Sequence, residues 1–286
     1  LALASRIFNR RTERAVRNGT ATYLGASVGR YRLYETVDGM ILSLRTSPQD
    51  WESALAQAEQ ELRRGIQFGF TQQELDEEMA GVQQAHETAV ERADTRKTYA
   101  GSEYNYAKAL VDAFADERVF TSPQSSLERI NALAETLTVE EVNTAFREAW
   151  SGYENPAIYY VSSEPLDNAE TALAQAIARS HKVAVKAPER RQTKAFAYTD
   201  FGPASAVTSE EYVEDADAHL ITFANNVRLN FKQTSFDTGS INIRVRVGHG
   251  FMTMPKKDEG LRRLGLNVLN ASGVAEHTAD DLSSLF

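Results

Sequence analysis

The side chains best suited to metal chemistry are five histidines: His86, His181, His219, His249 and His277. A catalytic zinc site needs about three protein ligands that converge on one point. One helix supplies two of them when histidines occur as His-Glu-x-x-His or, inverted, as His-x-x-Glu-His. Neither spacing occurs; Glu276-His277 is the nearest fragment, but its first histidine would fall on Gly273. We expect all five histidines at the surface, each in a different element.

His249 lies between Gly248 and Gly250, at the end of an expected strand. A loop that contacts a ligand and a plain strand-ending turn both fit this pattern. The turn is the simpler interpretation.

Other catalytic patterns are missing from the sequence. It has no cysteine, which excludes disulfides, thiolate metal sites and a cysteine nucleophile. It has no Gly-x-Ser-x-Gly elbow, no P-loop and no dinucleotide fingerprint. The carboxylates of Glu74, Asp76, Glu77 and Glu78 cluster at an expected helix start, where they complement the helix dipole without any catalytic role. The tyrosine-rich segments fit a peptide groove, but core and sheet packing is the simpler interpretation.

Composition places the chain among globular proteins. Its 286 residues suit about two domains, and 42% of them are hydrophobic. The net charge of -9 argues against nucleic acid as the main partner, because phosphate binding needs clustered lysine and arginine. No apolar run approaches the roughly 18 residues of a membrane-spanning helix, so we expect no membrane span. Periplasm and cytoplasm both remain open.

Helix and strand signals alternate along residues 1–179. A helix is expected to end near Asn18-Gly19, and a hairpin to turn at Asp38-Gly39. Further helices are expected from Pro48, from the capping boxes at residues 71–74 and 138–141, over residues 104–114, from Ser122-Pro123 and over residues 166–178. A short strand is expected over residues 157–161. The fold class is therefore α+β, with long helices packed on an antiparallel sheet.

The remaining chain divides into a linker and a second region. Residues 180–207 mix basic, proline and small residues without a period, which is typical of an extended linker, and an acidic stretch (residues 210–217) follows it. Residues 208–286 form the second region. It begins with a hairpin around Asn225-Asn226 and continues with a half-buried strand over residues 241–247, where Ile and Val alternate with polar residues. A helix over residues 260–270 follows, and another helix starts at Thr278.

Phrases in both regions resemble the insulinase/pitrilysin family of zinc metallopeptidases, which includes the mitochondrial processing peptidase subunits. In the first region they are Ser5-Arg-Ile-Phe-Asn-Arg-Arg11, Ala54-Leu-Ala-Gln-Ala-Glu-Gln-Glu-Leu62, Gly69-Phe-Thr-Gln-Gln-Glu-Leu75 and Leu137-Thr-Val-Glu-Glu-Val142. In the second they are Phe223-Ala-Asn-Asn-Val-Arg-Leu229 and Gly260-Leu-Arg-Arg-Leu264.

Members of this family consist of α+β halves, each with two similar subdomains, that close around a chamber. The resemblance implies that residues 1–179 are the later subdomain of the first half. Residues 180–207 would join the halves, and residues 208–286 would begin the second half. We therefore expect the chain to be a piece of a longer protein.

The resemblance places the family's catalytic helix at Gly260-Leu261. The two histidines of His-x-x-Glu-His then correspond to Arg263 and Asn267. The glutamate of the motif corresponds to Leu266. Arginine does not ligate zinc, leucine does not accept a proton, and asparagine is a poor zinc ligand. This half is expected to be degenerate, with no zinc and no catalysis in the chain itself. The resemblance implies a zinc site upstream of Leu1.

The function that follows is part of a zinc-dependent metalloendopeptidase that hydrolyses peptides or unfolded polypeptides in its chamber. This chain would form non-catalytic chamber wall and hinge, and would contact the remaining subdomains of the same protein. An alternative is a non-catalytic scaffold or partner subunit of the same family. A generic α+β binding module is a third interpretation. Open strand edges in the second region leave pairing with another copy possible.

Overall fold

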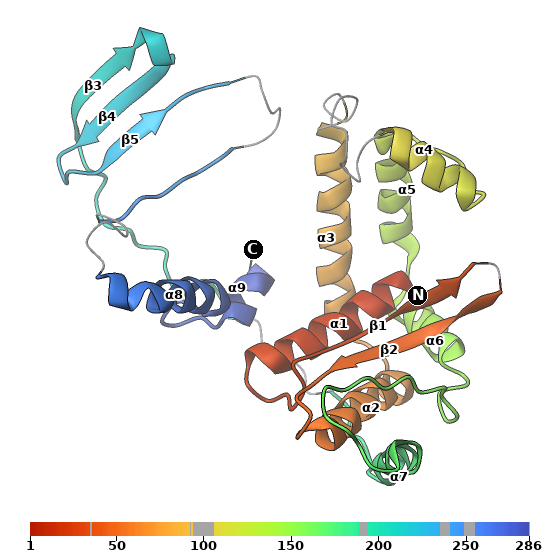
Figure 1. The fold of residues 1–286 in the computed structure, drawn as a ribbon. Coiled ribbons are helices and arrows are strands. Elements are labelled where there is room, and N and C mark those ends of the chain that lie inside the picture. The colour runs from red at the N-terminus through yellow and green to blue at the C-terminus, as the bar shows by residue number, and fades with distance from the viewer. Residues whose placement is uncertain are drawn as a thin grey trace. The chain divides into compact units, whose positions relative to one another are not determined.

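The computed structural model describes residues 1–34, 36–91, 93, 106–188, 194–234, 241–248 and 255–285. Runs of helices follow runs of antiparallel strands in the described residues, so the predicted α+β class is confirmed (Figure 1). The described residues group into two compact units: Leu1–Ala85 with Glu128–Thr193, and His86–Leu127 with Lys194–Leu285. The domain boundaries given above stay a prediction.

The first unit combines one hairpin with several helices. Its elements are α1 (Ala2–Arg17), β1 (Gly25–Leu33), β2 (Val37–Arg45), α2 (Trp51–Phe68), most of α3 (Gln72–Glu91), most of α5 (Pro123–Thr136), α6 (Val139–Ala149) and α7 (Ala169–His181). Helix α1 packs on β1, α2 packs on α7, and α6 contacts both α1 and α2.

The β1–β2 hairpin turns before the predicted Asp38-Gly39. Leu33 pairs with Val37, so Asp38 and Gly39 both lie within β2. Asp38 accepts a hydrogen bond of 2.7 Å from the Arg30 guanidinium of β1. This cross-strand ion pair favours a strand position for Asp38 over the turn position that its sequence signal predicts.

Side-chain caps fix the starts of α3, α5 and α6. In both predicted capping boxes, Thr71–Glu74 and Thr138–Glu141, the threonine hydroxyl accepts from the glutamate N–H and the glutamate carboxylate accepts from the threonine N–H. Ser122 accepts from the N–H of Ser125 at the start of α5. The prediction at Pro48 was wrong by three residues, because residues 48–50 form a turn and α2 begins at Trp51.

The core of the first unit lies where α1, α2, α6 and the hairpin meet. Phe146 of α6 is fully buried at its centre. Phe70 meets it edge to face at 5.0 Å between ring centroids, and Phe8 of α1 stacks on it at 6.3 Å. The remaining buried members are Ala4, Ile7, Val28, Leu62, Leu75, Val142 and Trp150.

Asn143 clamps the chain between α2 and α3. Its side-chain oxygen accepts from the N–H of Phe70 at 2.7 Å, and its side-chain nitrogen donates to the carbonyl of Phe70 at 3.2 Å. Gly69 makes this approach possible, because a Cβ there would lie 2.5 Å from the Asn143 Cγ. Gly69 also has φ of 72°, a conformation that other residues avoid.

Arg11 joins α1 to the start of α3. Its guanidinium donates to both carboxylate oxygens of Glu74, at 2.5 and 2.7 Å, and lies 4.9 Å from the centre of the Phe70 ring. Burial raises the pKa of Glu74, but the hydrogen bonds and charge of Arg11, together with Thr71, hold this pKa below its usual range. Arg6 and Arg10 extend the contact by pairing with Glu78.

The second unit contains α4 (Tyr106–Ala115), β3 (Val207–Val213), β4 (Ala218–Phe223), β5 (Arg228–Phe231), α8 (Glu259–Ala271) and α9 (Ala279–Leu285). The strands pair in the order β3-β4-β5, all antiparallel. The predicted Asn225-Asn226 turn joins β4 to β5, with Asn226 at φ of 66°. Strand β3 was not predicted, because it overlaps the acidic stretch at residues 210–217, where charged residues are unfavourable for a strand.

Two predicted strands were wrong. Residues 157–161 form no strand, and Tyr159 is 90% exposed. Residues 241–247 are likewise outside the sheet, and Ile241, Ile243, Val245 and Val247 are each at least 79% exposed. Alternation of apolar and polar residues shows that one face of a segment could be buried. A strand also needs a neighbouring strand whose backbone groups pair with its own. The predicted helix over residues 166–178 begins later, at Ala169.

Substituting Gly69 tests the clamp, with Gly19 as a matched control. Both have positive φ, but a Cβ at Gly19 would meet nothing within 4 Å. We expect Gly19→Ala to lower the free energy of unfolding by about 1 kcal/mol, from backbone strain alone. Gly69→Ala should cost about 3 kcal/mol, because the backbone at φ of 72° and ψ of -160° is open essentially only to glycine and because Asn143 must also move. Urea unfolding followed by tryptophan fluorescence measures this unit, which contains Trp51 and Trp150. Equal costs would contradict the clamp.

The Arg11–Glu74 pair predicts a stability loss in acid. Because the pKa of Glu74 is lower in the folded unit than in the unfolded chain, its stabilisation is present above the unfolded value of about 4.3 and is lost as pH falls further. We expect Glu74→Gln to flatten the fall in unfolding free energy between about pH 5 and pH 3. Glu141→Gln, in the exposed capping box, is the control and should flatten it less. An unchanged slope in Glu74→Gln would refute this role.

Candidate functional site

Helix α8 carries the three positions at which the resemblance places the catalytic motif. Arg263, Leu266 and Asn267 all lie within its bounds, Glu259–Ala271, and Asn267 is exposed. Across the described residues, no three His, Cys, Asp or Glu side chains lie close enough together to hold a metal ion. That this helix is degenerate stays a prediction.

His277 does not lie at the surface, so the expectation for this histidine was wrong. It is only 3% exposed, whereas His86, His181 and His219 are partly exposed. His249 falls outside the described residues. A surface interpretation failed here because His277 follows the exposed Glu276, and the covering residues come from a distant part of the sequence.

The cover is residues 194–198, which we call the strap. The N–H of Ala197 donates to His277 Nε2 at 2.9 Å. The Phe196 ring stacks on the imidazole at 5.4 Å between centroids, with an interplanar angle of 13°, and Tyr198 meets it edge to face at 5.8 Å. The Tyr198 hydroxyl also accepts from the N–H of Glu276 at 3.0 Å. The strap is therefore fixed to the turn before α9.

This turn, residues 272–278, has little freedom of its own. Val274 and His277 exchange backbone hydrogen bonds of 2.8 and 2.7 Å. Gly273 passes so close that a Cβ there would lie 1.8 Å from the His277 carbonyl oxygen. Thr278 then caps α9 through reciprocal bonds with Asp281, at 2.9 and 3.1 Å. The sequence shows the glycine of this turn and the threonine that caps α9. It does not show that the strap covers His277.

The first unit holds the chain after α7 in a different way. Arg63 of α2 is 6% exposed and donates to the carbonyls of Ser180 at 2.9 Å and Val183 at 2.6 Å. Its charge is matched by Glu59, one turn earlier, at 2.9 Å, and Glu59 also accepts from the Ser180 hydroxyl. Arg64 adds a bond of 3.0 Å to the carbonyl of Lys186. Hydrogen bonds from Arg63 and Arg64 therefore tie the end of α7 and the residues that follow it to α2.

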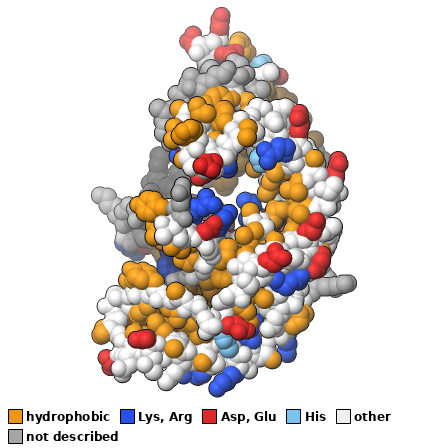
Figure 2. All heavy atoms as spheres, turned by 90° about the vertical axis from the view of Figure 1, so that its right-hand side faces the viewer, with side chains coloured by type: hydrophobic (Ala, Val, Ile, Leu, Met, Phe, Trp, Pro, Cys, Tyr) orange, Lys and Arg blue, Asp and Glu red, His pale blue; other side chains and the backbone are white. Residues whose placement is uncertain are grey.

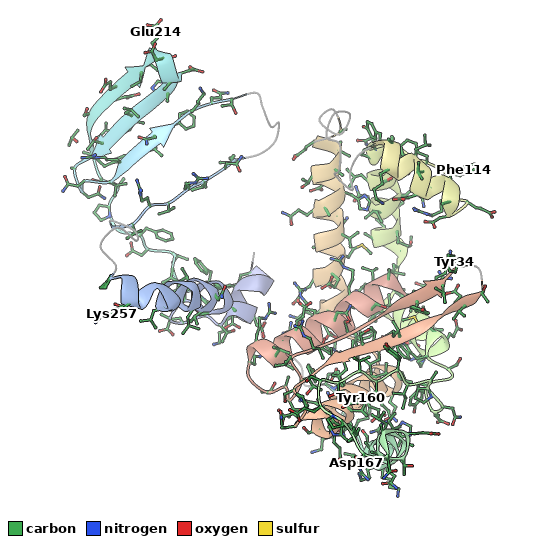
Figure 3. All side chains as sticks on the ribbon, viewed as in Figure 1. Tyr34, Phe114, Tyr160, Asp167, Glu214 and Lys257 are labelled. Carbon is green, nitrogen blue, oxygen red and sulfur yellow. The ribbon has the colours of Figure 1, made fainter. Side chains whose placement is uncertain are left out.

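An apolar hollow of about 380 Å³ lies between α4 and the start of α5. Tyr106, Leu110 and Phe120 form much of its lining. Figure 2 views the molecule from the side on which α4 lies in Figure 1, and hydrophobic side chains gather on this face. Phe114 points away from α4 into solvent and is 86% exposed (Figure 3).

In the part of the chain that the structure describes, no helix has the length and apolar character needed to cross a membrane.

Comparison with solved structures identifies the fold. The chain is similar over 98% of its length to the periplasmic protease PqqL from Escherichia coli, with 16% sequence identity and a TM-score of 0.50. It is similar over 66% of its length to the first half of PqqL, with 14% identity and the same TM-score, and covers 40% of that half. A ferredoxin protease, FusC, in complex with Arabidopsis ferredoxin matches at 10% identity and a TM-score of 0.45, with 82% of this chain and 26% of that chain covered.

The chain spans 31% of PqqL, less than a third of that protein. No family model and no curated protein matches the chain. At these identities the likeness to PqqL shows a shared α+β fold.

Removing Arg63 should strongly destabilise the first unit, because it takes the guanidinium away from the buried Glu59 carboxylate and leaves only His181 and the Ser180 hydroxyl beside it. We expect Arg63→Leu to lower the free energy of unfolding by about 3–5 kcal/mol, measured in urea by tryptophan fluorescence. Arg64→Leu, at a more exposed ion pair, should cost about 1 kcal/mol or less. The double variant Glu59→Leu with Arg63→Leu should recover part of the loss. A double variant less stable than Arg63→Leu would contradict this explanation.

Proposed function

We propose that the chain is a non-catalytic part of an insulinase-like zinc metalloendopeptidase that hydrolyses peptides or unfolded polypeptides. The observation that carries the proposal is the likeness to PqqL, a periplasmic protease, along 98% of the chain. The sequence phrases that resemble the insulinase/pitrilysin family support it independently. A resemblance of this chain to the mitochondrial processing peptidase subunits, as one subgroup of that family, is part of the same proposal.

Two further observations suit a role as chamber wall and hinge. The chain covers under a third of PqqL, so the remaining subdomains of the protein would supply the zinc site. Within the chain, the residues that follow α7 are tied to α2 in the first unit, and the strap is tied to the turn before α9 in the second. A connection anchored at both ends transmits movement between the parts that it joins.

A periplasmic location belongs to the same proposal, because PqqL is periplasmic. The zinc, the polypeptide substrate and the inactivity of this chain on its own are likewise proposed.

The competing function is a non-catalytic scaffold or partner subunit of the same family. Positions Arg263, Leu266 and Asn267 do not distinguish the two functions, because the resemblance places the catalytic zinc site upstream of Leu1 in either case. The zinc content of the intact protein distinguishes the two functions.

We expect the intact protein that contains this chain to bind one zinc ion and to cleave an unstructured peptide. A chelator should abolish cleavage and added zinc should restore it. Residues 1–286 alone should bind no zinc stoichiometrically and cleave nothing. Tight stoichiometric zinc binding by residues 1–286 would refute the non-catalytic role. An intact protein with neither zinc nor cleavage would establish the scaffold function instead.

A further inference from the structure

Neutral His277 holds the strap with one particular ring nitrogen. Because Nε2 accepts the N–H of Ala197, the proton of the neutral ring must be on Nδ1. Nδ1 is buried and has no hydrogen-bond partner in the described part of the chain. The ring therefore makes a single hydrogen bond through its side chain, and that bond depends on an unprotonated Nε2.

Protonation removes this bond and creates a burial problem. An imidazolium carries N–H groups at both nitrogens, so Nε2 would point a donor at the Ala197 donor. The ring would also place a charge between Phe196 and Tyr198, away from solvent, which is costly without a paired charge. Release of the strap separates the two donors and ends the burial of the charge, because the ring then reaches water.

We propose that His277 is a pH-responsive latch that holds the strap against the turn before α9 when neutral and releases it when protonated. The latch is thus closed while the ring is neutral and opens when falling pH protonates it.

The charged and titratable groups around the latch come from both elements that form it. On the strap they are Lys194 and Tyr198, and on the turn and α9 they are Glu276, Asp280 and Asp281. Lys194 lies 3.8 Å from Asp281, so these two charges offset one another. The Tyr198 hydroxyl holds the backbone of Glu276 whether or not His277 is protonated, so only the Ala197 bond responds directly to pH.

Amide hydrogen exchange at Ala197 tests the latch in residues 1–286. After correction for the intrinsic pH dependence of exchange, protection of Ala197 should be present at pH 8. Once falling pH begins to protonate the ring, protection should fall about tenfold per pH unit, as the neutral fraction of the ring does. The backbone bonds of the β1–β2 hairpin are the internal control and should keep their protection. Protection of Ala197 that does not change with pH would overturn the proposal.

Two substitutions separate titration from packing. The side-chain oxygen of Gln occupies a position similar to that of Nε2 and accepts without titrating over this pH range, so His277→Gln should keep the protection and lose its pH dependence. His277→Ala removes the acceptor, so protection should be low at every pH. A pH dependence that survives in His277→Gln would show that another group is responsible.

The unaltered protein provides a test that does not depend on the folding of any variant. Nitrogen-15 NMR of the imidazole reports which ring nitrogen carries the proton. We expect the Nδ1–H form of His277 at pH 8, and a change to imidazolium over the pH range in which Ala197 loses protection. An Nε2–H form at pH 8, or two transitions at different pH, would refute the latch.

Discussion

The clamp between Asn143 and the backbone of Phe70 is the contact on which the first unit depends. It fixes the short connection between α2 and α3, and so places the Phe70 ring against Phe146. Once Phe70 is in place, Arg11 lies over its ring and reaches the Glu74 carboxylate at the start of α3. One amide thus connects α6, α2, α3 and α1. The clamp requires glycine at position 69, because any side chain there would occupy the space of the amide.

This arrangement explains the phrases that carry the family resemblance in the first unit. The phrase that begins at Ser5 contains Phe8 and Arg11, and the phrase that begins at Gly69 contains Phe70 and the Thr71–Glu74 capping box. The phrase that ends at Val142 leads directly to Asn143 and then to Phe146. These phrases are far apart in the sequence but meet in one buried cluster. The residues behind the resemblance therefore include those that hold the subdomain together, which indicates fold more directly than catalysis.

Sequence signals predicted best those features that depend only on residues close together in the sequence. The capping boxes at Thr71 and Thr138 begin helices where the sequence places them, because a cap involves only four neighbouring residues. Signals that depend on a distant partner failed. Asp38-Gly39 pairs across a hairpin instead of turning, and the apolar face of residues 241–247 has no covering layer in the described residues. The site was harder still, because nothing next to His277 in sequence shows that residues 196–198 cover it.

The contacts that hold the chain after α7 and the strap differ in their physical chemistry. The chain after α7 is tied to α2 by Arg63, which is charged at every physiological pH and is matched by a buried carboxylate. The strap is tied by a neutral ring, aromatic stacking and a tyrosine hydroxyl. Breaking the first contact leaves Arg63 paired with Glu59 of its own helix but without two carbonyl acceptors, whereas opening the second exposes mainly apolar rings and one imidazole to water. The first contact therefore depends on a guanidinium that its own helix keeps paired, whereas the second depends on the burial of three rings and on one ring nitrogen that can accept a hydrogen bond.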